Sequence, residues 1–212
     1  FASAGSSQIG GNIATNAGGI KVIRYGMTRD WVLGLKVVTG AGELLELNRG
    51  LLKNNTGYDL RHLFIGSEGT LGLICEATIK LARPPVDLAV LVLGVNDFPS
   101  IMTVLEKYTA AMDLTAFEFF SEAALCRVTE HTGLARPFES QAPFYALLEF
   151  EQGGDQLDTA MALFEQCLEA ELVSDGVVSQ SLSQAANLWK LREDISETLW
   201  HYKPYKNDIS VK

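Results

Sequence analysis

The sequence predicts an α+β fold in two domains of different character. Glycine is concentrated near the N-terminus, because residues 1–82 hold 14 of the 19 glycines. Charge divides in the same way: residues 1–82 carry eight Lys+Arg against six Asp+Glu, and residues 83–212 carry nine against twenty. Beyond Pro84 and Pro85, strand and helix periodicities alternate. These contrasts predict a glycine-rich domain at 1–83 and an acidic α+β domain at 84–212.

The elements of the first domain follow from its apolar runs. Residues 31–38 are rich in β-formers, residues 39–42 supply turn chemistry and residues 43–47 read as a second strand, so a hairpin is expected. Residues 59–65 favour one or two helical turns, and residues 71–81 alternate as a strand does. The proline pair then ends the domain, since paired prolines cannot continue a ladder.

The second domain reads as a β-α-β-β-α-β order. This order predicts a ferredoxin-like antiparallel sheet covered by helices on one face. We expect Ser100 and Asp155 to cap helices, and Leu157, Met161, Phe164, Leu168 and Leu172 to form a core-facing stripe. The expected strands are 88–94, 116–120, 144–150 and 177–178, and the expected helices are 100–112, 122–131, 155–172 and 184–200.

Residues 5–26 alternate glycine pairs with small polar residues. Such a run lets backbone amides approach a ligand closely, and a phosphorylated or heteroaromatic guest suits it. Neither the G-x-G-x-x-G spacing of Rossmann domains nor the Walker spacing is present. The alternative interpretation is a turn-rich loop without a ligand.

Cations gather at the end of the acidic domain. Residues 189–206 contain Lys190, Arg192, Lys203 and Lys206, four of the nine cations of residues 83–212. A guanidinium binds a carboxylate through two parallel hydrogen bonds, so this segment favours capture of a small anion. The alternative is a solvated helix face paired with its own acidic residues.

Composition limits the partners and the compartment. The acidic second domain disfavours nucleic acid and anionic membranes, and no apolar run approaches the ~20 residues of a membrane helix. Cys75, Cys126 and Cys167 lie in apolar runs without C-x-x-C spacing, so we expect buried thiols in a reducing compartment, the cytoplasm. Because Phe1 comes first and residues 209–212 read as the middle of a strand, we expect a fragment that lacks both ends.

Two long motifs carry a family resemblance. Residues 5–26, followed by residues 53–60 and 64–74, closely resemble the FAD-binding domain of the vanillyl-alcohol-oxidase (PCMH) type. Within that superfamily they look most like the D-2-hydroxyglutarate, D-lactate and glycolate dehydrogenase branch. Residues 188–196 and 205–211 resemble the substrate-domain motifs of the same branch, that is, of the FAD-linked oxidase C-terminal domain.

The resemblance implies specific roles. Arg192, Ser196 and Lys206 match the positions that hold substrate carboxylates, with serine where threonine is common; Trp189 and Tyr205 are expected to be packing residues. His62, His131 and His201 lack partners at a catalytic spacing, so no catalytic base is expected in this chain. The positions that match the FAD lining of the family are Gly10, Gly11, Asn16, Ala17, Gly18, Gly19, Tyr25, Gly26, Glu68, Gly72 and Ile74. The metal-binding and proton-accepting histidines of the family belong to a later motif outside this chain.

The implied activity is FAD-dependent oxidation of a D-2-hydroxy acid, of the 2-hydroxyglutarate, lactate or glycolate type, to the 2-oxo acid. Hydride passes to the flavin and electrons then leave to a separate acceptor. The fragment alone is expected to be inactive, and its binding of FAD, its oligomeric state and the identity of the acceptor stay open, with a homodimer as one option. The alternatives are a flavin oxidoreductase with another alcohol substrate, and a non-catalytic remnant or binding module.

Overall fold

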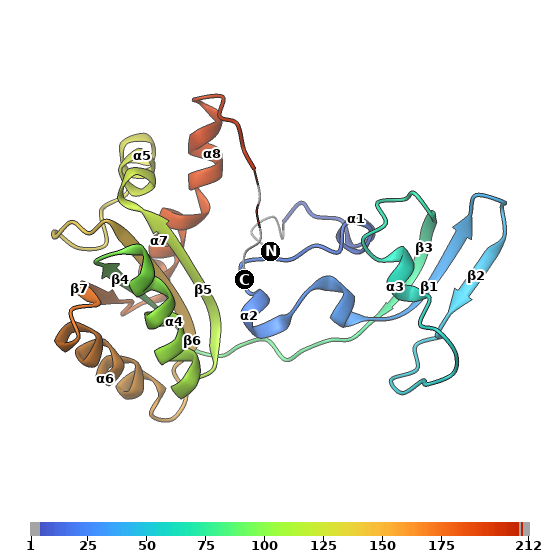
Figure 1. Ribbon diagram of the computed structural model, residues 1–212, viewed down its shortest axis with the longest axis horizontal. Helices are drawn as coiled ribbons and strands as arrows, with labels where there is room; N and C mark the ends of the chain where they lie inside the picture. The colour runs from blue at the N-terminus through green and yellow to red at the C-terminus, as the bar shows by residue number, and fades with distance from the viewer. Residues whose placement is uncertain (1–4, 208, 210–212) are drawn as a thin grey trace. The chain divides into compact units, whose positions relative to one another are not determined.

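The computed structural model describes residues 5–207 and residue 209 (Figure 1). The chain divides into two compact units, Phe1–Pro84 and Pro85–Lys212. The strand predicted at 209–212 lies largely outside the described residues. The α+β class is confirmed, since each unit combines helices with an antiparallel sheet.

The first unit is built on a three-stranded sheet in the order β2-β1-β3. The predicted hairpin is confirmed, with Leu35 opposite Leu47 and Val38 opposite Leu44. The strands are β1 (Val32–Thr39), β2 (Leu44–Leu47) and β3 (Gly72–Ile79), and the helices are α1 (Ile9–Ala14), α2 (Val22–Tyr25), η1 (Thr28–Trp31) and α3 (Arg61–Phe64).

The glycine run contributes one residue to the core of this unit. Ile13 of α1 is fully buried and packs with Leu35, Val37, Phe64 and other residues of the sheet side. Ile13 therefore anchors α1 in the core, and the other residues of the run are half-buried or exposed.

The second unit is ferredoxin-like, as predicted. Its sheet has the order β5-β6-β4-β7 with antiparallel pairs. The strands are β4 (Leu88–Val95), β5 (Leu114–Ser121), β6 (Phe144–Glu151) and β7 (Val173–Val178). The helices are α4 (Phe98–Ala111), α5 (Glu122–Thr132), α6 (Gln156–Glu169), α7 (Leu182–Glu193) and α8 (Ile195–Trp200).

Helices cover both faces of this sheet, so the prediction of one covered face was wrong (Figure 1). Helices α4 and α6 pack on the face that carries Leu91 and Leu93. Helices α5 and α7 lie against the opposite face, where Val90 and Val92 are also fully buried. The central strand β4 is apolar on both sides because both sides are covered.

Helix boundaries differ in detail from the prediction. Asp97, not Ser100, caps α4, because its Oδ1 accepts a hydrogen bond from the Ser100 amide at 2.8 Å. Asp155 precedes α6 but its side chain makes no capping bond. The most buried positions of α6 are Ala160, Leu163 and Cys167, while Leu168 is exposed. The small Ala160 allows close approach to α4, where the Tyr108 hydroxyl donates to the Ala160 carbonyl at 3.0 Å.

The last helix is interrupted rather than continuous. Asp194, with φ −75° and ψ −3°, ends α7 and precedes α8. The amide of Asp194 donates to the Lys190 carbonyl, and the amide of Thr198 donates to the Asp194 carbonyl, so Asp194 is hydrogen-bonded to both helices. Consequently the helix predicted at 184–200 is divided into α7 and α8.

Only one of the three cysteines is buried as predicted. Cys167 is buried, Cys126 is half-buried and Cys75 is exposed, and all three are free thiols. Cys75 falls at the register shift of β3, where Ile74 and Glu76 pair with consecutive residues of β1 and Cys75 has no partner position. Within the described residues, no helix is long and apolar enough to cross a membrane.

Candidate functional site

The two glycine-rich motifs of the first unit meet through their backbones. The amide of Gly66 donates to the Ile13 carbonyl at 3.1 Å, and the amide of Glu68 donates to the Ala14 carbonyl at 2.9 Å. These are carbonyls at the end of α1, where the helix leaves acceptors unused. Residues about 50 positions apart in the chain are thereby joined into one surface.

Asn16 organises the turn that follows α1. It adopts a left-handed conformation with φ 48°, and its Oδ1 accepts a hydrogen bond from the Arg29 amide at 3.0 Å. The carbonyl of Ala17 accepts from both the amide and the hydroxyl of Thr28, at 3.1 and 2.8 Å. The two positions are therefore held by the start of η1.

The predicted flavin-lining glycines fall into two groups. A Cβ atom added to Gly10 or Gly11 would meet nothing within 4 Å, so their backbone faces open space. A Cβ atom on Gly18 would lie 2.7 Å from the Met27 sulfur, and one on Gly72 would lie 2.7 Å from the Val38 carbonyl. Gly72 thus serves packing within the sheet, and its neighbour Ile74 likewise packs against the core.

Other predicted flavin-lining residues border a cavity of about 380 Å³ in the first unit. Gly19, Tyr25 and Gly26 line it, together with the indole of Trp31 and the side chain of Lys80. The Trp31 Nε1 donates to the Tyr25 carbonyl, and the Lys80 ammonium lies 5.3 Å from the centre of the Trp31 ring. The cavity is mostly apolar, with cations at its border.

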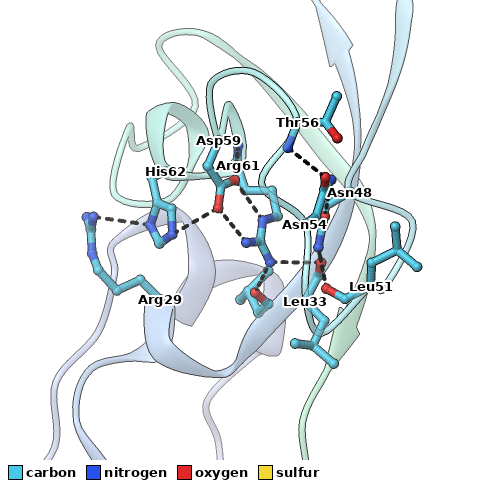
Figure 2. Close-up of polar contacts among 10 residues, drawn as sticks. Arg29, Leu33, Asn48, Leu51, Asn54, Thr56, Asp59, Arg61 and His62 are labelled. Atoms are coloured by element: carbon cyan, nitrogen blue, oxygen red, sulfur yellow. Dashed lines mark hydrogen bonds and ion pairs between the residues drawn. The ribbon is translucent and has the colours of Figure 1, made fainter.

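Arg61 holds the loop that contains the motif at 53–60 (Figure 2). Its Nη1 donates to the carbonyls of Val32 and Leu33 at 2.7 and 2.8 Å, and its Nε donates to Asp59 at 2.8 Å. The hydrogen bond from Arg61 lowers the pKa of Asp59, and burial opposes this shift. Asn48 donates to the Leu33 carbonyl as well. The loop is therefore fastened to the start of β1.

In the second unit, Arg192 forms an ion pair with a carboxylate of the sheet. Its Nη2 lies 2.7 Å from Oε2 of Glu118 on β5, and both side chains are largely buried. The Arg192 Nε is buried and has no hydrogen-bond partner among the described residues. Burial raises the pKa of Glu118, although the neighbouring guanidinium opposes the shift.

Ser196 and Lys206 line one cavity of about 200 Å³ beside α8. Trp200 and Tyr205 also border it, whereas Arg192, on the preceding helix, does not. Trp189 packs as predicted, since it is 9% exposed and donates from Nε1 to Glu149 at 2.8 Å. The packing role expected for Tyr205 was wrong, because its side chain is fully exposed.

Glu118, Glu149 and Arg61 are site-forming residues that the sequence reasoning missed. The signal for the two glutamates was present, because each interrupts an apolar strand at an inward position. Arg61 gave no such signal, since its bonds are to backbone carbonyls distant in sequence. Among the described residues, no group of three His, Cys, Asp or Glu side chains could hold a metal ion. His62 lies 3.5 Å from Asp59, and the rings of His131 and His201 are 4.3 Å apart.

Two family models match parts of this chain. Residues 84–212 match the family described as FAD linked oxidases, C-terminal domain, and residues 1–48 match the FAD binding domain family. Among solved structures, an alkyldihydroxyacetonephosphate synthase aligns with a TM-score of 0.61 at 20% identity, over 91% of this chain and 36% of that chain. A p-cresol methylhydroxylase aligns with a TM-score of 0.52 at 14% identity, over 80% of this chain and 42% of that chain. At these identities the likeness shows the fold alone.

Curated relatives are much more similar in sequence. A D-2-hydroxyglutarate dehydrogenase of Stutzerimonas stutzeri is 64% identical over all of this chain and 46% of its own length. The enzyme of that name from Xanthomonas citri is 57% identical, over 100% of this chain and 45% of its length. The mitochondrial D-2-hydroxyglutarate dehydrogenase from Bos taurus is 41% identical, over 98% of this chain and 39% of its own length. The chain thus spans less than half the length of these relatives, and the resemblance seen in its motifs is confirmed. Because the C-terminal domain model matches more than half of the chain, the chain belongs to the family of FAD linked oxidases.

Proposed function

We propose that this chain is part of an FAD-dependent dehydrogenase that oxidises a D-2-hydroxy acid to the 2-oxo acid. D-2-hydroxyglutarate is the substrate that the relatives' names favour. The observation that carries the proposal is Arg192, a guanidinium that stays 29% exposed beside its ion pair with Glu118. A carboxylate is the natural acceptor for such a donor.

The first unit fits a flavin nucleotide. Gly10 and Gly11 leave the backbone open, as a dinucleotide approaching the main chain requires, and Asn16 and Glu68 hold left-handed turns beside them. Residues 1–82 have a surplus of only two cations, so amides and dipoles are expected to carry most of the diphosphate contact. When bound, FAD supplies the hydride acceptor.

The second unit is expected to bind the substrate. We propose that Arg192 binds one substrate carboxylate, and that Ser196 and Lys206 contribute a hydroxyl and an ammonium from the cavity that they share. Charge-assisted hydrogen bonds of this kind contribute roughly 1.5–3 kcal/mol each. We assign the base that takes the hydroxyl proton to no residue of this chain.

Two further elements belong to the same proposal. A dehydrogenase must pass its electrons on, so a separate acceptor reoxidises the flavin. The free thiols of Cys75, Cys126 and Cys167 support a reducing compartment, and we propose the cytoplasm.

The test uses the full-length protein. Flavin absorbance is expected, and turnover of D-2-hydroxyglutarate, D-lactate and glycolate is compared with an artificial electron acceptor. Arg192→Ala should raise KM for the preferred substrate roughly 10- to 100-fold and leave the bound flavin unchanged. Lys190→Ala is the matched control, because it removes an exposed cation from the same helix. A colourless protein that takes up no added FAD would refute the proposal.

A further inference from the structure

We propose that Glu118 and Glu149 are positioning residues: from two adjacent strands they hold α7 in the orientation that presents Arg192 to a substrate carboxylate. The inference rests on the proposed function, since it concerns the arginine assigned there to substrate binding. It adds two residues to the site and states how they act.

The two glutamates lie next to each other on one face of the sheet. In the register of β5 and β6, Glu118 is opposite Leu147 and Ala116 is opposite Glu149. Residues two apart on a strand point to the same side, so Glu118 and Glu149 are diagonal neighbours. The opposite face of the same strand carries Leu148 in the apolar core.

Each glutamate bonds one side chain of α7. Trp189 Nε1 donates to Glu149 at 2.8 Å, and Arg192 Nη2 lies 2.7 Å from Glu118. Trp189 and Arg192 are three residues apart and therefore project from one side of the helix. The helix is thus bonded to two strands at two points along its length.

These two polar bonds fix the orientation of α7, which the neighbouring apolar contacts cannot do. Leu188 and Leu191 bury α7 against the sheet, but apolar burial is non-directional and tolerates rotation of the helix. Hydrogen bonds depend on distance and angle, so two of them define the rotation and the axial position of α7. Arg192 lies in the last turn of α7, immediately before the chain turns at Asp194, so its placement depends on that rotation.

Stability alone does not explain buried carboxylates at these positions. Glu149 is only 3% exposed and Glu118 is 18% exposed by side chain. Burying a carboxylate is unfavourable unless it is paired, and apolar residues of similar volume are often at least as stabilising. The bonds to α7 therefore favour a role in orientation.

Glu118 also leaves donors of Arg192 for a ligand. A guanidinium has five N–H donors, the ion pair with Glu118 uses Nη2, and the Arg192 side chain stays 29% exposed, so part of the guanidinium remains accessible to a ligand. Holding the guanidinium in place before substrate arrives reduces the entropy lost on binding. We therefore expect Glu118 to influence substrate affinity through Arg192.

The test is a double-mutant cycle in the full-length, flavin-loaded protein with D-2-hydroxyglutarate. Glu118→Ala should raise KM roughly tenfold or more with an unchanged amount of bound flavin, and E118Q, which keeps an acceptor oxygen, should stay within about threefold of wild type. The double variant of Glu118→Ala and Arg192→Ala should match Arg192→Ala within about twofold, because Glu118 acts through that arginine. Glu106→Ala, an exposed glutamate on α4, is the control and should change nothing.

Each of the following results would overturn the inference. An unchanged KM in Glu118→Ala, with an impaired Arg192→Ala, refutes it and leaves the proposed function standing. An unchanged KM in Arg192→Ala refutes both the inference and the assignment of that arginine. Multiplicative effects in the double variant show that Glu118 acts independently. If Glu118→Ala does not fold, Trp189→Phe tests the other bond: a three- to tenfold higher KM is expected, and an unchanged KM refutes the inference.

Discussion

Replacing Arg61 by lysine should loosen the loop of residues 48–60 without unfolding the first unit. The Arg61 side chain is 15% exposed and bonds the carbonyls of Val32 and Leu33 and the carboxylate of Asp59 (Figure 2). A lysine ammonium keeps the charge, but it is a compact donor and cannot reproduce the planar fork that spans these acceptors.

The size of the effect follows from the bonds that are lost. Hydrogen bonds that involve a charged group contribute about 1.5–3 kcal/mol each, and lysine is expected to retain one of them. The Leu33 carbonyl keeps a second donor in Asn48, which reduces the loss. A net loss of about 2–3 kcal/mol corresponds to roughly 30- to 150-fold more frequent opening of the loop.

Hydrogen exchange measures that opening directly. The amides of Leu51 and Thr56 report on it, because both are hydrogen-bonded within the loop. Arg49→Lys is the control, since Arg49 is exposed and forms an ion pair with the nearby Glu46. Exchange in the Arg61→Lys loop within threefold of wild type would refute the reasoning.

Three further predictions concern stability. Glu122→Gln should lower the melting temperature at pH 7: burial raises the pKa of Glu122, but hydrogen bonds from Arg136, Tyr145 and Cys126 outweigh burial and leave it below the usual value. This stabilisation is present above the unfolded-state pKa and is lost as pH falls through the lower folded-state pKa, so the difference between wild type and variant should shrink in acid. Asp97→Ala removes the cap of α4 and should cost about 1 kcal/mol in thermal unfolding; an unchanged melting temperature would contradict the role of the cap. Gly72→Ala places a Cβ 2.7 Å from the Val38 carbonyl and should lower the melting temperature more than Gly10→Ala, which meets open space.

Much of the second unit could be predicted because its strands and helices carry their own periodicity. The order of elements was sufficient for the ferredoxin-like topology. The covering of both faces could also have been found, since β4 is an unbroken apolar run and such runs are typical of strands buried on both sides. The cap at Asp97 could also have been predicted, because proline is favoured in the first turn of a helix and Pro99 therefore indicates a helix that begins just before Pro99. The interruption of the helix at Asp194 could not be predicted, because no glycine or proline lies there in the sequence.

The candidate site shows where sequence reasoning stops. Composition located the stretches where a backbone can approach a ligand, but it could not separate Gly10, which faces open space, from Gly72, which faces a carbonyl. The bonds that join the two motifs use backbone groups of Ile13 and Gly66, and the sequence of side chains gives no sign of backbone hydrogen bonds.

Glu68 is an example of a residue whose role is visible only in the structure. It has φ 51° and lies between Gly66 and Gly69, which also have positive φ, and this conformation is unfavourable for a residue with a side chain by roughly 1 kcal/mol. The amide of Glu68 donates a hydrogen bond to the Ala14 carbonyl, so the strained turn at Glu68 joins its own loop to α1. Only the folded structure connects that strain to the surface where we propose FAD binding.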